Sequence, residues 1–150
     1  MKRTYFAVCL ALGVMFGCGV YTFRYAKGLS YLSNDPKACM NCHVMTEQYN
    51  SWVKSSHHAA ASCNDCHIPH TFPMKYVAKG LNGWNHSKAF TLQDFPEPIR
   101  ITHRNLVNLQ KNCVECHSTF VSEIGAHDKA LKGEARCTDC HRSVGHMNLD

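Results

Sequence analysis

The sequence lacks several patterns that would indicate common classes of protein. It contains ten cysteines but no Cys-x-x-Cys-x-x-Cys run, which argues against a cubane iron–sulfur cluster. Residues 5–23 carry no charged side chain, and residues 20–25 offer no small-residue A-x-A site for the removal of a leader peptide. These absences leave two features to explain: the arrangement of the cysteines and the long uncharged stretch near the N-terminus.

Eight of the cysteines belong to a five-residue motif, Cys-x-x-Cys-His, that occurs four times. This motif attaches c-type haem, because its two thiols form thioethers with the porphyrin vinyl groups and its histidine is placed to ligate the iron. Structural zinc also uses Cys-x-x-Cys pairs, but it does not need a histidine after every second cysteine. We therefore predict four covalently bound haem c groups, on Cys39 and Cys42, Cys63 and Cys66, Cys113 and Cys116, and Cys137 and Cys140.

Four haems would change both the charge and the core of the protein. The formal net charge of +5 would be offset by about eight haem propionates, so the basic balance does not indicate a nucleic-acid partner. About 125 residues would have to wrap the four cofactors, so the porphyrins would form most of the apolar interior. We predict a mainly α fold with much irregular loop.

The uncharged stretch at residues 5–23 predicts a single transmembrane helix, because as a helix it would span about 28 Å. A cleaved leader usually has a shorter apolar region and a small-residue cleavage site. We therefore predict an uncleaved anchor over residues 1–27 in the bacterial inner membrane. Two basic residues precede the stretch, which favours a cytoplasmic N-terminus, and two follow it. Because c-type haems are attached on the outer side of that membrane, we expect residues 28–150 to be periplasmic.

The spacing of the motifs suggests two di-haem modules. The motifs begin at residues 39, 63, 113 and 137, so the two pairs have the same internal spacing and a longer interval separates them. This predicts modules at 28–70 and 113–150, joined by a segment at 71–112. Helices are expected at 46–61, 74–90 and 121–132. The aromatic and lysine side chains of 74–90 suit either the headgroup layer of a membrane or a solvated helix over a haem.

Second axial ligands for the irons are sought among the seven histidines outside the motifs. His146 follows His141 too closely to reach the far face of the same haem, so a neighbouring haem is its better target. Only one of His57 and His58 is expected to be a ligand. His127 is a further candidate that the sequence leaves open.

The chain resembles the membrane-anchored tetrahaem quinol dehydrogenases of the NapC/NirT type. The resemblance covers essentially the whole chain and rests on the N-terminal span, the four motifs and the stretches CHVM, SSHH, CNDCHIPH and CTDCHRSVGHM. The short chain and CNDCHIPH favour the members that serve cytochrome c nitrite reductase. The resemblance implies that the chain oxidises menaquinol and passes electrons to a periplasmic catalytic subunit that reduces nitrite to ammonium.

The same resemblance implies axial ligands for the first two haems. The first haem would take Met45 rather than His43, although the sequence alone favours a methionine that packs against the porphyrin. The second haem would use His67 and a lysine supplied by the catalytic partner subunit.

For the third and fourth haems the resemblance implies two pairs of histidines. His117 would pair with His146. His141 would pair with His57, or with His58 if the alignment shifts by one residue.

The family's quinol site has the pattern Lys-x-x-x-Gly-x-x-Asp. Lys79 and Gly83 fit it, but His86 stands where the acid would be. An imidazole titrates near neutral pH, so His86 could accept the quinol proton, or it could ligate the first iron. Two other functions remain open: a quinol dehydrogenase for a different periplasmic reductase, and a tethered electron-transfer wire in which His86 is structural.

Overall fold

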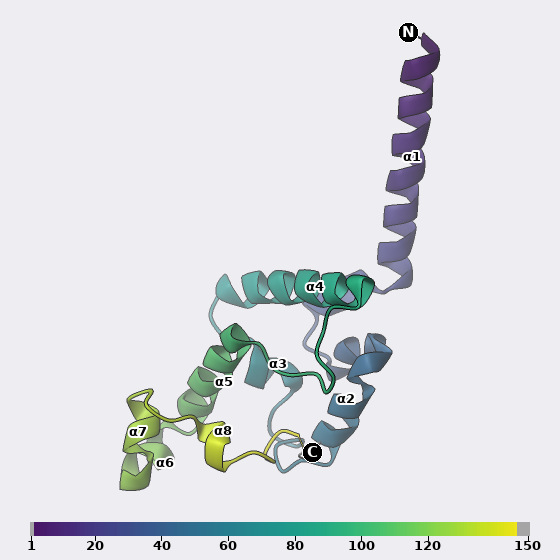
Figure 1. Cartoon of the computed structure of the whole chain (residues 1–150). Helices are drawn as coiled ribbons and strands as arrows, with labels where there is room; N and C mark the ends of the chain where they lie inside the picture. The colour runs from purple at the N-terminus through teal and green to yellow at the C-terminus, as the bar shows by residue number, and fades with distance from the viewer. Residues whose placement is uncertain (1, 147–150) are drawn as a thin grey trace.

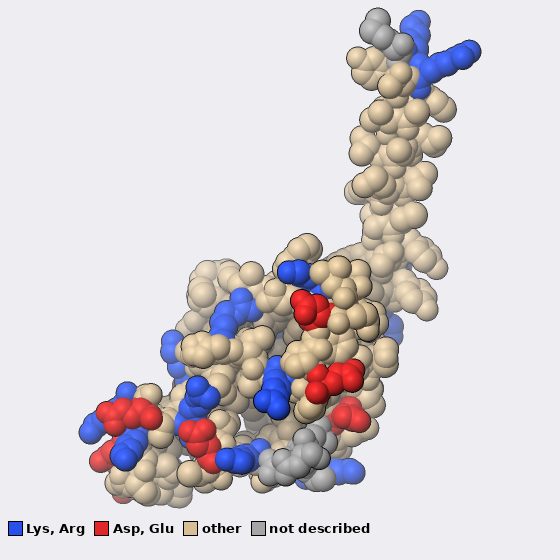
Figure 2. Space-filling model, viewed as in Figure 1, with Lys and Arg blue, Asp and Glu red and all other residues tan. Residues whose placement is uncertain are grey.

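The structure, a computed structural model, describes residues 2–146 and places one long helix, α1 (Lys2–Tyr25), away from the remaining elements (Figure 1). Every described residue of α1 is exposed, and its mean hydropathy reaches 2.0. In the face shown in Figure 2, the sides of α1 are uncharged and basic side chains stand at its free end. The prediction of a helix long and apolar enough to cross a membrane is confirmed.

The other described residues form short helices and loops, with no strand among them. The elements are η1 (Gly28–Leu32), η2 (Pro36–Asn41), η3 (His43–Met45), α2 (Thr46–Val53), α3 (Cys63–His67), α4 (Met74–Leu92), α5 (His103–Cys116), α6 (Ser118–Glu123), η4 (Gly125–His127), α7 (Asp128–Leu131) and α8 (Cys137–Cys140). The buried hydrophobic residues among them are few: Trp52, Ile68, Ala78, Val121 and Ala130. The mainly α fold with much loop is thus confirmed, and side chains alone supply only a small core.

Two of the expected helices are shorter than the sequence predicted. The helix expected at 46–61 ends at Val53, because the Trp52 indole donates a hydrogen bond of 2.9 Å to the Ala61 carbonyl and turns the chain back. The helix expected at 121–132 is divided among α6, η4 and α7, since Ile124 has extended backbone. The helix expected at 74–90 is confirmed as α4.

The junction after α1 sets the direction of the chain. Lys27 adopts a left-handed conformation with φ of 51°, and a side chain at position 28 would collide with the ring of Phe23. A larger residue at position 28 would therefore require the Phe23 ring to move. The turn leads into η1, which packs on α4, and α4 lies across the end of α1 (Figure 1).

The second, third and fourth haem-attachment motifs gather around α5. Its Asn112 side chain is buried and donates to the carbonyls of Cys66, at 3.0 Å, and Ile68, at 2.9 Å, so α5 is tied to α3. The Gln110 side-chain oxygen accepts a 2.9 Å hydrogen bond from the backbone of Cys137 at the start of α8. Helix α5 runs through residue 112, where the sequence placed the boundary of the second module. The division into two di-haem modules stays a prediction.

Candidate functional site

Three pairs of histidine rings lie at nearly the same centre-to-centre separation. Two imidazoles that ligate one iron from opposite sides have ring centres about 6 Å apart, because each coordinating nitrogen lies roughly 2 Å from the metal. The observed centre-to-centre distances are 5.9 Å for His57–His117, 6.1 Å for His67–His146 and 6.1 Å for His127–His141. Each pair contains one motif histidine, so the spacing fits a haem iron between the two rings.

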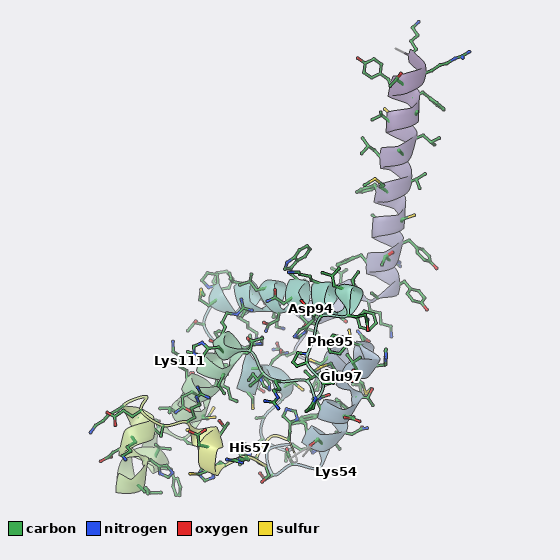
Figure 3. All side chains as sticks on the ribbon, in the orientation of Figure 1. Lys54, His57, Asp94, Phe95, Glu97 and Lys111 are labelled. Carbon is green, nitrogen blue, oxygen red and sulfur yellow. The ribbon has the colours of Figure 1, made fainter. Side chains whose placement is uncertain are left out.

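Hydrogen bonds to backbone carbonyls orient two of the partner rings. His57 Nδ1 lies 3.2 Å from the Val144 carbonyl, and His146 Nδ1 lies 3.0 Å from the Gln48 carbonyl. With the proton on Nδ1, each ring donates this bond and keeps the Nε2 lone pair for a metal. His58 instead packs its ring against the Trp52 indole, at 4.8 Å between centres. This arrangement favours His57 over His58 as a ligand, and His57 lies between the end of α2 and α8 (Figure 3).

His127 is a candidate ligand that the sequence left open. Its Nδ1 atom is buried and has no hydrogen-bond partner among the described residues. A buried polar nitrogen without a partner is costly, so an additional group in contact with this ring would stabilise the site. The nearby ring is His141 of the fourth motif, which makes His127 a candidate second ligand for the fourth haem.

The observed ring pairs differ from those implied by the resemblance. His117 was expected to face His146 and His141 to face His57, whereas His117 lies against His57 and His146 lies against His67. The physical reason is the path of the segment after α8, which the hydrogen bonds at Gln48 and Val144 hold against the region of α2. The assignment of ligands to individual irons stays a prediction, as does a partner's lysine on the second iron.

The motif cysteines carry free thiols, and the histidine of the second motif is neutral. The eight motif cysteines are half-buried or exposed and form no disulfide, so their thiols are accessible to a porphyrin edge. Burial lowers the pKa of His67 to about 4, with His146 and His86 acting in the same direction. Its imidazole is therefore neutral and can donate a lone pair to iron.

The first motif lies beside the residues expected to bind quinol. The His43 ring meets Phe90 of α4 edge-on, at 6.0 Å between centres, and Met45 is half-buried at the end of η3. Lys79 is only 2% exposed. Its ammonium donates to the carbonyls of Leu32, at 3.0 Å, and Ser33, at 2.6 Å.

The ammonium of Lys79 makes a third hydrogen bond, of 3.1 Å, to the side-chain oxygen of Asn34. All three of its N–H groups are therefore used within the chain. Burial lowers the pKa of Lys79, Lys75 lowers it further, and the nearby Cys39 thiol acts in the opposite direction. The Lys79 side chain thus ties the residues after η1 to α4 next to the first motif.

The structure adds Tyr31, which the sequence did not single out, to this group. Its hydroxyl lies 2.7 Å from His86 Nδ1, and its ring passes over Gly83, at 3.5 Å from where a β-carbon would stand. Burial raises the pKa of the Tyr31 phenol, with Cys39 and Cys42 adding to the effect, and burial lowers the pKa of His86. Both groups are therefore neutral near pH 7. No local pattern in the sequence indicated this contact, which joins residues 55 positions apart.

Comparisons with known proteins identify the family of the chain. The model of the NapC/NirT cytochrome c family, N-terminal region, matches residues 1–150. Cytochrome c-type protein NrfH of Wolinella succinogenes is 39% identical over 158 residues, covering 97% of this chain and 89% of the relative. Cytochrome c nitrite reductase subunit NrfH of Nitratidesulfovibrio vulgaris is 32% identical over 124 residues, covering 83% of this chain and 74% of the relative.

A solved structure supports the same relationship over nearly the whole chain. It is the crystal structure of the cytochrome c nitrite reductase NrfHA complex bound to the HQNO inhibitor. The TM-score is 0.67 at 29% sequence identity, and the match covers 94% of this chain and 92% of that chain. The fold, the four motifs and these similarities lead to one conclusion: the chain belongs to the NapC/NirT cytochrome c family.

Proposed function

We propose that this chain is the membrane-anchored tetrahaem quinol dehydrogenase subunit of a cytochrome c nitrite reductase complex. The observation that carries the proposal is the match to NrfH over 97% of the chain, anchor included, together with the likeness to a chain of the NrfHA complex. The chain is a single-pass inner-membrane protein that receives electrons from menaquinol and passes them to the catalytic subunit, where nitrite is reduced to ammonium. The chain's own chemistry is therefore the oxidation of quinol.

Four haem c groups, held by the eight motif cysteines, supply one-electron redox centres when bound. We assign the ligand pairs from the ring geometry: His117 with His57, His67 with His146, and His141 with His127. The centre-to-centre distances near 6 Å support these pairs over the ones implied by the resemblance. Met45 is kept as the ligand of the first iron, because the His43 ring is in edge-on contact with Phe90.

His86 is the proposed acceptor of the quinol proton. Its Nδ1 is engaged by the Tyr31 hydroxyl, so Nε2 is the nitrogen available to a quinol hydroxyl. The lowered pKa of His86 keeps the ring neutral and able to accept a proton at neutral pH. Tyr31 acts as a positioning residue, since it fixes the plane of the imidazole. Lys79 is also a positioning residue, because its three hydrogen bonds hold residues 32–34 beside Tyr31 and His86.

The orientation in the membrane is part of the proposal. With the N-terminus cytoplasmic, residues 28–150 lie on the periplasmic side, where c-type haems are attached and where a soluble catalytic subunit can dock. The partner subunit's lysine, implied by the resemblance for the second haem, competes in this arrangement with His146.

The test is quinol-dependent nitrite reduction by the complex purified in mild detergent and returned to lipid vesicles. We expect ammonium to form when a menaquinol analogue is the only electron donor, and we expect this to require the tetrahaem chain. The His86→Gln variant, with full haem content, should lose quinol oxidation but still pass electrons from a small reductant such as dithionite. Equal quinol oxidation by His86→Gln would favour the tethered wire. Copurification with another reductase would overturn the nitrite assignment.

A further inference from the structure

Helix α4 has one face turned toward the rest of the protein. This inner face consists of Lys79, Asn82, Gly83, His86 and Phe90, at the three- and four-residue spacing of one side of a helix. Its members contact Tyr31, His43 and the residues after η1, and Asn82 accepts a hydrogen bond of 2.8 Å from Arg104. The contact between α4 and the first haem motif, which Phe90 makes with His43, is therefore on this side.

The opposite side of α4 is apolar and uncovered. This outer face consists of Met74, Val77, Leu81, Trp84 and Leu92, which follow the same helical spacing. The side chains are between 44% and 69% exposed, and Trp84 is the most exposed of them. Single exposed apolar residues are ordinary, but a continuous stripe along one helix indicates an interaction surface. Lys88 lies within the stripe, and α4 contains no acidic residue.

The position of α4 relative to α1 identifies what covers this stripe. The chain leaves α1 through η1, which packs on α4, and α4 lies across the end of α1 rather than along it (Figure 1). When α1 crosses the bilayer along the membrane normal, α4 therefore lies parallel to the membrane plane. Tyr21 and Tyr25, 71% and 80% exposed, mark the same end of α1. Tyrosines of this kind collect at the headgroup level of a bilayer.

We propose that the outer face of α4 lies in the headgroup layer of the membrane that α1 crosses. Its aliphatic residues and Trp84 would enter the boundary between headgroups and acyl chains, with Lys88 reaching to the phosphates. Helix α4 then has lipid on its outer face and Lys79 and His86 on its inner face. A substrate dissolved in the bilayer would therefore be separated from Lys79 and His86 by this one helix. The inference rests on α1 spanning the membrane and does not depend on quinol chemistry.

A photoreactive side chain provides the test. Benzoylphenylalanine is placed at position 84 of the full-length holoprotein, which is returned with its complex to vesicles of phosphatidylethanolamine and phosphatidylglycerol and illuminated. The matched control carries the probe in place of Phe120, an apolar residue of α6 that is 64% exposed. In Figure 1, α6 lies at the end of the molecule away from α1. We expect phospholipid adducts at position 84 and almost none at position 120.

A second measurement needs no substitution. Vesicles containing a phospholipid with a diazirine near the headgroup are illuminated with the unaltered complex. Trypsin cleavage after Lys79 and Lys88 releases residues 80–88, which contain Leu81 and Trp84. Stronger labelling of this peptide than of the Phe120 peptide supports the proposal. Equal labelling, or protein cross-links in place of lipid adducts at position 84, would overturn it and point to a protein partner on this face.

Discussion

The contacts of Lys79 lead to a quantitative prediction for the Lys79→Met variant. Methionine keeps most of the length of the side chain but removes three charge-assisted hydrogen bonds, to Leu32, Ser33 and Asn34. A hydrogen bond to a charged group contributes about 1.5–3 kcal/mol, and the loop can recover part of the loss by binding water. We therefore expect the free energy of unfolding to fall by about 3 kcal/mol.

The assay is thermal unfolding of the detergent-solubilised holoprotein, followed by circular dichroism of the haem absorption at a fixed heating rate. For a domain of this size the apparent midpoint should fall by roughly 10 °C. The matched control is Lys88→Met, the same substitution on an exposed residue of the same helix, and it should leave the midpoint almost unchanged.

The two readouts separate a positioning role from a direct one. If Lys79→Met melts like Lys88→Met but loses quinol oxidation, Lys79 acts on the substrate and its hydrogen bonds in the free protein do not describe its role. If it melts early and a second substitution, Lys79→Arg, restores both properties, the positioning role holds. If neither stability nor activity changes, the reasoning from the three hydrogen bonds is refuted.

Three further predictions concern His86, Tyr31 and His127. Because burial lowers the pKa of His86, its neutral form persists below the ordinary histidine range, and kcat/KM for quinol should fall only as the pH drops through that lowered pKa. This fall in kcat/KM at low pH, the acid limb of the pH profile, should vanish in His86→Gln. If the acid limb persists in that variant, another group is responsible for it. Tyr31→Phe keeps the packing over Gly83 but loses the hydroxyl on His86 Nδ1. It should lower quinol oxidation several-fold and move the acid limb, with haem content unchanged, whereas an unaltered pH profile would count against positioning. His127→Met replaces an imidazole by a thioether, so redox titration should show one haem at higher potential, while the matched His58→Met variant should leave all potentials in place. Equal effects of the two variants would contradict the pairing of His127 with His141.

The parts of the molecule that the sequence predicted well depend on neighbouring residues. Haem attachment needs two thiols and a histidine within five residues, so the motif at Cys39 can be recognised without any knowledge of the fold. The membrane span likewise depends only on a continuous apolar stretch long enough to cross a bilayer. Helix α4 was expected at 74–90 because Pro73 and Pro96 flank this stretch, and the structure extends it only to Leu92.

Expectations that depended on distant contacts fared less well. The helix expected at 46–61 stops early because the Trp52 indole reaches the carbonyl of Ala61, a competition that periodicity does not reveal. The Tyr31 contact with His86 joins η1 to α4, and neither residue stands in a local motif that names the other.

The sequence by itself therefore determined that the chain carries four haems and a membrane anchor, since both depend on covalent spacing and local hydropathy. Only the tertiary structure decided which histidine rings face each other. His57 and His146 reach their partners because the backbone carbonyls of Val144 and Gln48 accept their N–H groups, and these pairs lie 87 and 98 residues apart in the chain. The pairing of these rings depends on the path of the whole chain, which no spacing within a motif can encode.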